Sequence, residues 1–155
     1  MARPLSERDN SLSALGTDAG ALDASLGFTA STADRSAIDA ADLVICNNTS
    51  MESDHLVLAV RVIQAVRGGA KLIVSNSALD PADQALSTVA MDPMRGRAAI
   101  LWNGILQLLI DGGVFSASEI GGIEGGSAFL EGRDFRLDTV AALSGVDPSA
   151  MRAAA

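Results

Sequence analysis

The sequence has few of the residues that build metal centres. Among its 155 residues it contains one cysteine, Cys46, and one histidine, His55. A single cysteine cannot form an internal disulfide, and it cannot supply the several thiolates that an iron–sulfur cluster needs. One histidine and one cysteine also fall short of a typical zinc site. The composition therefore predicts no metal ion or cluster held by this chain alone.

Basic and aromatic residues are also scarce. Eleven Lys and Arg residues stand against nineteen Asp and Glu residues, which gives a formal net charge of −8. Because a phosphate backbone is bound by clustered cations, this balance argues against nucleic acid as a partner. Aromatic residues make up 3% of the chain, whereas all hydrophobic residues together make up 48%. The core is therefore predicted to be aliphatic.

No segment has the pattern of a secretory signal or of a membrane-spanning helix. The first ten residues are charged and lack an apolar stretch. The longest apolar stretch, residues 98–110, contains Asn103 and Gln107 and is too short to cross a bilayer. We therefore expect a cytoplasmic chain without direct membrane insertion.

Two apolar runs predict buried parallel strands. The runs "DLVICNN" (42–48) and "AKLIVSNS" (70–77) are apolar until they end in small polar residues. Such continuous runs are typical of strands with helices on both faces of the sheet. A helix is predicted between them over residues 55–67, so that the three elements form a βαβ unit. The polar residues of this helix are expected to form one narrow solvent-exposed stripe: Arg61, Gln64 and Arg67.

The remaining pattern completes an α/β fold. It predicts a short strand within 86–92, a helix over 98–111 and two short C-terminal helices capped by Asp138 and Asp147. A short helix over 16–26 and a glycine-rich loop at 121–127 are also expected. The predicted fold is an open, mostly parallel sheet with helices on both faces, plus a C-terminal helical segment.

We divide the chain into three parts on this basis. Residues 1–15 form a loose N-terminal segment, residues 16–113 the α/β core, and residues 114–155 an extension of loop and short helices. The last predicted helix ends after two turns, which is expected of a segment that continues into a larger subunit.

Small polar residues follow both main strands. Asn48 and Ser50 come after the first strand, and Ser75 and Asn76 end the second. In an open parallel sheet, ligands bind beyond the carboxyl ends of the strands, near helix N-termini. These side chains are therefore candidates for a ligand site. Neither strand is followed by a glycine-rich turn, which argues against a free-standing nucleotide-binding module.

Three segments, taken in order, resemble the molybdopterin oxidoreductase superfamily. They are "SLGFTASTADRSAIDAADLVICNNTSMESDHLVLAVRVIQAVRGGAKLIVSNS", "AILWNGILQLLIDGGVF" and "LSGVDPSAMRAAA". The resemblance covers roughly residues 20–155 and is to the large subunits of formate dehydrogenases and NADH-quinone oxidoreductase. It implies an internal α/β domain of a larger subunit. The implied partners are the other domains or subunits of an oxidoreductase complex, including iron–sulfur proteins.

The resemblance also implies where a molybdopterin guanine dinucleotide cofactor would bind in the parent subunit. The family's Gly-x-Asn falls at Asn48 and Ser50, its Asp-Pro-Arg starts at Asn76, and its Gly-Thr/Ser-Asp/Asn starts at Gly96. The family's histidine at the helix start falls at His55. The candidate cofactor-binding residues are Asn48, Ser50, His55, Ser75, Asn76, Gly96 and Arg97.

Several family residues are replaced at these positions. Asn76 stands where relatives carry Asp, and Ala78 stands where they carry Arg. A lost charge-assisted hydrogen bond costs about 1.5–3 kcal/mol, so the replacements weaken or abolish cofactor binding. Arg97, at a helix start, is one residue that can restore a phosphate contact. No nucleophile with a neighbouring base is visible, and Cys46 is interpreted as a core residue.

Three functions remain as hypotheses. The first is a structural lobe of a formate-dehydrogenase-like or NADH-dehydrogenase-like electron-transfer enzyme, with no catalysis of its own and no cofactor held by this chain alone. The second is a functional lobe that binds molybdopterin guanine dinucleotide. The third is a free-standing nucleotide-binding module.

Overall fold

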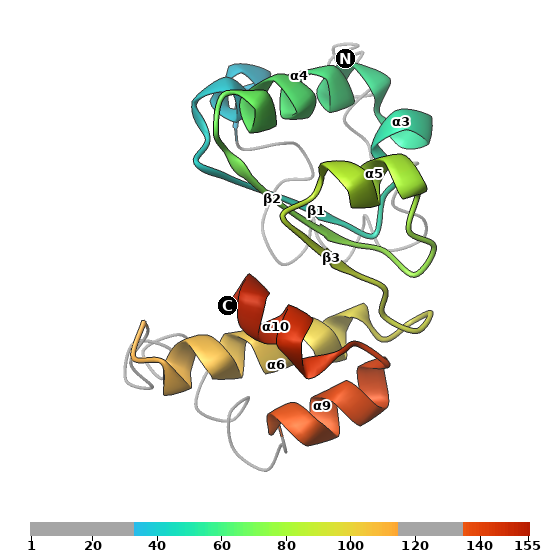
Figure 1. The fold of residues 1–155 in the computed structure, drawn as a ribbon, viewed down its shortest axis with the longest axis vertical. Helices are drawn as coiled ribbons and strands as arrows, with labels where there is room; N and C mark the ends of the chain where they lie inside the picture. The colour runs from blue at the N-terminus through green and yellow to red at the C-terminus, as the bar shows by residue number, and fades with distance from the viewer. Residues whose placement is uncertain (1–32, 115–134) are drawn as a thin grey trace, which may run out of the picture. The chain divides into compact units, whose positions relative to one another are not determined.

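The computed structural model describes residues 33–114 and 135–155 (Figure 1). Residues 38–155 belong to one compact unit. The helix predicted over 16–26 and the glycine-rich loop predicted at 121–127 lie outside the described residues.

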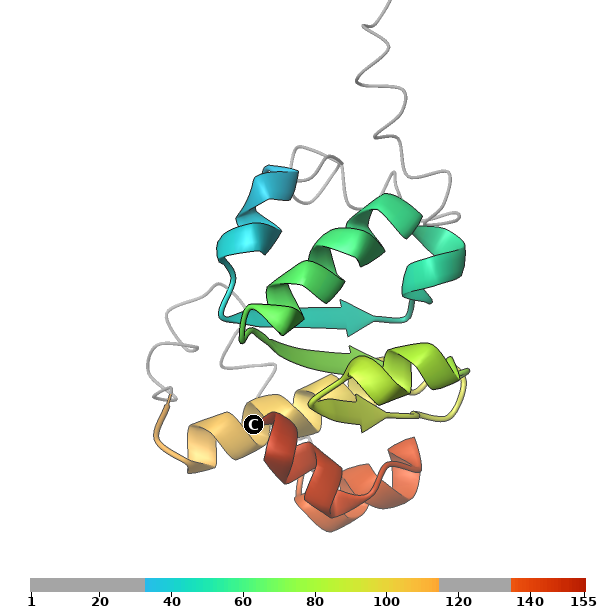
Figure 2. The same ribbon diagram turned by 45° about the horizontal axis from the view of Figure 1, so that its top comes forward.

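Three parallel strands form the sheet in the order β1-β2-β3 (Figure 2). They are β1 (Leu43–Asn47), β2 (Lys71–Ser75) and β3 (Val89–Met91). Asn47 is paired with Ser75, and Ser75 with Met91, so all three strands end at the same edge. The predicted parallel α/β fold is confirmed.

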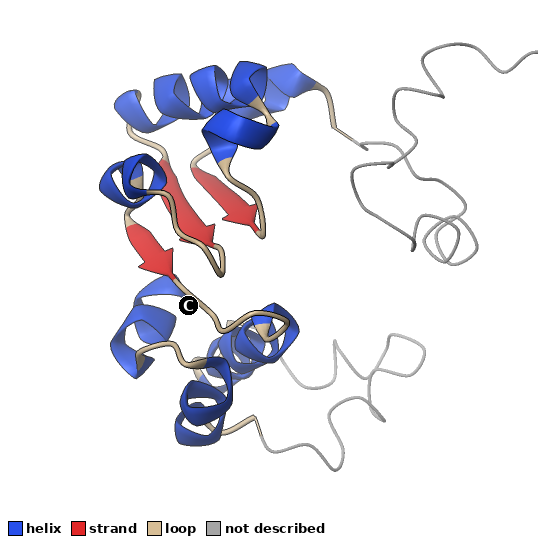
Figure 3. Cartoon of the chain, turned by 90° about the vertical axis from the view of Figure 1, so that its right-hand side faces the viewer, coloured by secondary structure: helices blue, strands red, loops and turns tan. Residues whose placement is uncertain are grey.

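Helices cover the sheet from two sides (Figure 3). One side holds α3 (Met51–Asp54), α4 (Leu56–Arg67) and α5 (Pro81–Leu86), and the other holds α6 (Ala98–Asp111), α9 (Leu137–Ser144) and α10 (Pro148–Ala154). A 3-10 helix, η2 (Arg35–Ala40), precedes β1. None of the helices within the described ranges is both long enough and apolar enough to cross a membrane.

Strand β2 is the centre of the fold because its side chains alternate between two cores. Leu72 and Val74 pack with residues of the α4 side, whereas Ile73 packs with residues of α6, α9 and α10. The first core consists of Met51, Ala59, Val62, Leu72 and Val74. The second consists of Ile73, Met91, Leu101, Ile105, Val140, Val146 and Met151. The apolar run of β2 thus has the predicted cause, burial on both faces.

Strand β1 does not follow that prediction. Leu43 and Ile45 are each 49% exposed, and only Val44 and Cys46 pack against a core. The prediction that helices cover both faces of this strand was therefore wrong, because the described helices of the α6 side lie over β2 and β3.

Helix α4 is also less covered than its pattern indicated. Leu56 and Val57 are each 64% exposed and Val60 is 49% exposed, so the prediction of a single polar stripe was wrong. Only one face of the helix, through Ala59, Val62 and Ala65, is buried on the sheet. The first turn of α4 and the open face of β1 thus leave apolar surface exposed.

Local hydrogen bonds explain where the sequence-based bounds succeeded and failed. Asp147 caps α10 as predicted, since its carboxylate accepts a hydrogen bond from the Ser149 N–H at 2.7 Å. Helix α9 begins at Leu137, so Asp138 lies in its first turn and is not the cap. Helix α5 was not predicted; Asp80 caps it by accepting a hydrogen bond from the Ala82 N–H.

Candidate functional site

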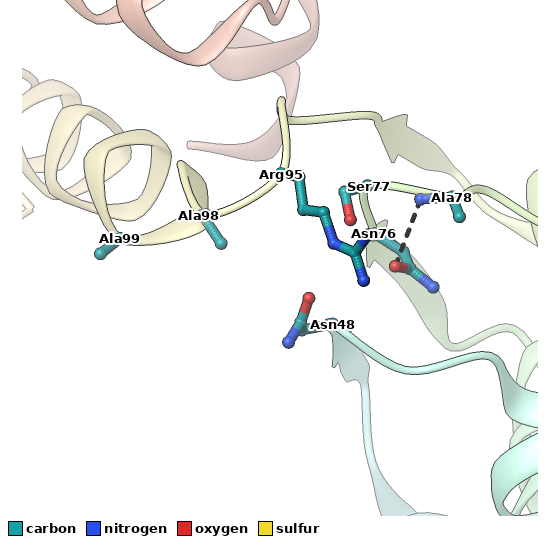
Figure 4. A pocket seen from close by; sticks show the side chains of 8 residues that line it. Asn48, Asn76, Ser77, Ala78, Arg95, Ala98 and Ala99 are labelled. Atoms are coloured by element: carbon teal, nitrogen blue, oxygen red, sulfur yellow. Dashed lines mark hydrogen bonds between the residues drawn. The ribbon is translucent and has the colours of Figure 1, made fainter. Parts of the chain in front are cut away.

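The polar residues at the carboxyl ends of the strands lie around one hollow (Figure 4). The Asn48 N–H donates to the Ser75 carbonyl oxygen at 2.7 Å, and the Asn76 N–H donates to the Met91 carbonyl oxygen at 3.1 Å. These bonds extend the sheet by one residue past β1 and β2. The hollow has a volume of about 610 Å³ and is lined by Asn48, Asn76, Ser77, Ala78, Arg95, Gly96, Ala98 and Ala99.

Two of the predicted residues shape the hollow through unusual backbone conformations. Asn48 has a φ of 56°, and Gly96 has a φ of 77°. Asparagine is among the few residues that adopt this left-handed region without a large cost, and glycine adopts it freely. Both residues line the hollow.

Arg95 is the residue that the sequence-based prediction missed. It extends from the segment between β3 and α6, and its guanidinium points toward Asn48 and Asn76 (Figure 4). Within the described ranges it forms no ion pair. None of the residues that line the hollow is an Asp or a Glu, so no carboxylate there compensates the positive charge of Arg95. This arrangement favours an anionic ligand.

Arg97 lies close in sequence but does not line the hollow. It is the N-cap residue of α6, is exposed, and makes no capping hydrogen bond with its side chain. Gly96, with its positive φ, lies between the two arginines and redirects the backbone. The Arg-Gly-Arg pattern was the available signal for Arg95, although the sequence does not say which arginine faces the ligand.

Ser50 and His55 are not part of this hollow either. The Ser50 N–H donates to the Asp54 carboxylate at 2.9 Å, and the Thr49 hydroxyl donates to it at 2.9 Å. These two hydrogen bonds, in that order, hold the pKa of the Asp54 carboxyl below its ordinary value. His55 is the N-cap residue of α4 and lines a separate apolar groove of about 470 Å³ along β1 and α4.

Ser75 is buried beneath the strand ends. Its side chain is fully buried, and its hydroxyl oxygen has no hydrogen-bond partner. Its carbonyl oxygen supports Asn48, but its side chain does not line the hollow. Of the seven candidate residues, the structure therefore brings three together at the hollow: Asn48, Asn76 and Gly96.

Cys46 behaves as a structural residue. Burial raises the pKa of its thiol, and the negative charge of Asp83 raises it further. A thiol with a raised pKa stays protonated at neutral pH and is a poor nucleophile. Asp83 itself is 2% exposed and accepts a hydrogen bond from the Met51 N–H at 3.2 Å, which ties α5 to α3. Neither residue lines the hollow.

Trp102 joins α6 to the end of β1. Its indole Nε1 donates a hydrogen bond to the Asn47 side-chain oxygen at 2.9 Å. The tryptophan packs at the edge of the second core while remaining partly exposed. This hydrogen bond helps to fix the helix beside the strand ends that form the hollow.

The donor groups of the hollow determine what it can hold. Within the described ranges no group of three or more His, Cys, Asp or Glu side chains is placed to bind a metal ion. The hollow offers one guanidinium, two carboxamides and the Ser77 hydroxyl, and it has no carboxylate to accept hydrogen bonds from a guanine or ribose. This donor set fits the phosphate groups of a dinucleotide cofactor better than its base.

Comparisons with known proteins identify the fold. No known family profile matches the chain, and no curated protein matches it. Eleven chains of solved structures do match. Acetylene hydratase from Pelobacter acetylenicus superposes with a TM-score of 0.59 at 19% sequence identity, over 73% of this chain and 16% of that chain. The chain thus shares its α/β fold with part of that enzyme and spans about one sixth of the enzyme's length.

Proposed function

We propose that this chain is an α/β domain of a larger molybdopterin-oxidoreductase-type protein, and that its hollow at the strand ends binds the phosphate-bearing part of a guanine-dinucleotide cofactor. The domain carries out no bond-breaking step itself. The parent enzyme would be of the formate dehydrogenase or NADH dehydrogenase type, as the sequence resemblance implies.

The main support for this proposal is the positive charge of Arg95, which no carboxylate of the hollow compensates. The guanidinium stands beside two carboxamides at the carboxyl ends of β1 and β2, where ligands of open parallel sheets bind. Guanidinium groups bind phosphate oxygens through paired, charge-assisted hydrogen bonds. Relatives carry an arginine at the position of Ala78. In this chain Arg95, on another wall of the hollow, would supply the positive charge instead.

The exposed apolar surfaces support a role inside a larger assembly. Leu43, Ile45, Leu56 and Val57 are each about half exposed or more. Large apolar side chains exposed on a strand and on a helix can pack against other domains or subunits. We therefore propose that the remaining domains of an oxidoreductase complex, including iron–sulfur proteins, cover β1 and α4.

A thermal-shift screen with GDP, GTP, NAD, AMP and inorganic pyrophosphate tests ligand binding. We expect GDP and pyrophosphate to raise the melting temperature of the chain and Arg95→Gln to remove the shift. Arg67→Gln is the matched control, because Arg67 is an exposed arginine at the C-terminal end of α4 that does not line the hollow. Equal shifts in the wild type and Arg95→Gln would contradict the proposed site.

A scaffold without any cofactor is the second candidate. The specific observation in its favour is that Asn76 and Ala78 replace the charged residues of the family pattern. Analysis of molybdenum, tungsten and pterin in the assembled protein separates the two candidates. We expect about one metal ion per subunit if the hollow serves a cofactor, and none if the domain is only a scaffold.

A further inference from the structure

The segment that carries Arg95 is anchored to the C-terminal helices. The Met94 N–H donates a hydrogen bond to the Ser144 carbonyl oxygen at 2.7 Å, and the Arg97 N–H donates to the Met94 carbonyl oxygen at 2.9 Å. Arg95 is the next residue after Met94 and extends into the hollow (Figure 4). The backbone that sets the start of the arginine side chain is therefore held from the end of α9.

Ser144, the residue that anchors Met94, is itself held firmly in place. Ser144 is fully buried, and its hydroxyl oxygen accepts a hydrogen bond from the Val146 N–H at 3.3 Å. The Gly145 N–H donates to the Ala141 carbonyl oxygen at 2.8 Å, which closes the last turn of α9. Val146 is buried in the second core. Because these contacts hold the turn from several sides, the Ser144 carbonyl oxygen that accepts from Met94 has one position relative to the sheet.

Gly145 also limits the room that is left for Met94. It has a φ of 78°, and a Cβ built on it would lie 3.0 Å from Met94 Cγ and 3.1 Å from Met94 Cε. Both distances are shorter than ordinary van der Waals contact, so a side chain at position 145 must displace the 58% exposed side chain of Met94 or shift the turn at Ser144. A shift of the turn would be passed to Arg95 through the hydrogen bond between the Met94 N–H and the Ser144 carbonyl oxygen.

We infer that the turn Ser144–Gly145 is a positioning element that aims Arg95 into the hollow, an inference that rests on the proposed anion-binding function. Neither residue lines the hollow, so both act through Arg95. The end of α9, within the part of the chain that the sequence indicated as a separate extension, would then contribute to the ligand site. A substitution at Gly145 is expected to weaken anion binding without touching the ligand.

Calorimetric titration of the full chain with GDP tests the inference. Gly145→Asn is the preferred variant, because asparagine tolerates a positive φ but still adds a Cβ against Met94. We expect the dissociation constant to rise at least about threefold, within the usual range of coupling between contacting residues. Asp147→Ala is the matched control: it removes the cap of α10 two residues away, does not contact the hollow, and should leave the affinity unchanged.

A double-mutant cycle assigns the effect to Arg95. Arg95→Gln is expected to weaken GDP binding about tenfold or more, and adding Gly145→Asn to it should weaken binding no further. Met94→Ala combined with Gly145→Asn removes the side-chain atoms that a Cβ at position 145 would meet, and should restore much of the affinity even where Gly145→Asn alone folds poorly.

The outcomes separate this inference from the proposed function. If the wild type binds no GDP, or binds it as Arg95→Gln does, the proposed function is wrong and the inference falls with it. If Arg95→Gln weakens binding while Gly145→Asn does not, only the positioning role is contradicted. If Gly145→Asn and Arg95→Gln each weaken GDP binding by a separate factor, and the two factors multiply in the double variant, the positioning role is contradicted as well.

Discussion

Asn48 combines a backbone requirement with a ligand-facing side chain. Its φ of 56° falls in the left-handed region, and its N–H is bonded to the Ser75 carbonyl oxygen. Asparagine is suited to both tasks, since its short polar side chain tolerates this conformation and its carboxamide can donate to or accept from a ligand. Two substitutions can separate the two tasks.

We predict that Asn48→Val lowers the free energy of unfolding by about 1–2 kcal/mol, because a β-branched residue is strained at this φ. Asn48→Gly should not lower it, since glycine adopts the same conformation freely. Both variants lose the carboxamide and should bind GDP more weakly than the wild type. Urea unfolding and calorimetry check the two effects. Equal stability of the Val and Gly variants would contradict the backbone requirement.

Asp54, the last residue of α3, supplies a pH-dependent contribution to stability. Hydrogen bonds from Ser50 and Thr49 lower the pKa of this carboxyl in the folded state. A lowered folded pKa stabilises the protein at pH values above the unfolded pKa of about 3.9, and the contribution is lost as the pH falls through the folded pKa.

We therefore predict that Asp54→Asn reduces the free energy of unfolding at neutral pH, and that its difference from the wild type shrinks below about pH 4. Urea unfolding at several pH values gives this difference. Asp92→Asn is the control, because Asp92 is exposed and takes part in no hydrogen bond or ion pair within the described ranges. A difference between Asp54→Asn and the wild type that stays constant with pH would contradict the assignment.

At the scale of elements, the crossing of α6 and α9 depends on a glycine. A Cβ on Gly104 would lie 2.5 Å from Val140 Cγ1 and 2.9 Å from Val140 Cγ2, closer than atoms in a folded protein approach. Both residues are buried in the middle of their helices. The absence of a side chain at position 104 thus lets the two helices approach closely.

We predict that Gly104→Ala destabilises the chain by about 1–3 kcal/mol through overpacking, in spite of the higher helix propensity of alanine. In a Val140→Ala background, which removes both Cγ atoms and leaves only the Cβ at 3.0 Å, the same substitution should cost clearly less. Thermal and urea unfolding of the four chains give both values. A loss of the same size in both backgrounds would show that the contact with Val140 is not the cause.

The elements that could be predicted from sequence are those with continuous local patterns. Helix α6 has the predicted bounds, 98–111, because apolar residues and two closing glycines mark its length. Strands β1 and β2 follow from their apolar runs. Helix α3 was missed, because four residues carry too little periodicity and the helix is supported by the distant Asp83 carboxylate.

The site was predictable only in part for a similar reason. The general rule for parallel sheets located Asn48 and Asn76 at the strand ends. Ser50 does not line the hollow, because its N–H, at the start of α3, donates to the Asp54 carboxylate. Arg95 was missed because its direction depends on the turn at Gly96 and on the anchor of Met94 to Ser144, which join residues distant in sequence.

At the scale of the whole molecule, the described unit resembles a part of a larger enzyme. It superposes on 16% of acetylene hydratase and leaves apolar residues of β1 and α4 exposed. The proposed function requires that a phosphate-bearing ligand binds in the hollow at the strand ends.

Residue-resolved NMR titration of the chain with GDP tests this claim most directly. We predict that the amide signals of Asn48, Asn76, Ser77 and Gly96 shift with saturation, and that Arg95→Gln removes these shifts. Signals of Asp42, Gly68 and Gly69, at the opposite ends of the strands, should stay in place. Shifts confined to that opposite end, or no shifts anywhere at millimolar GDP, would contradict the account.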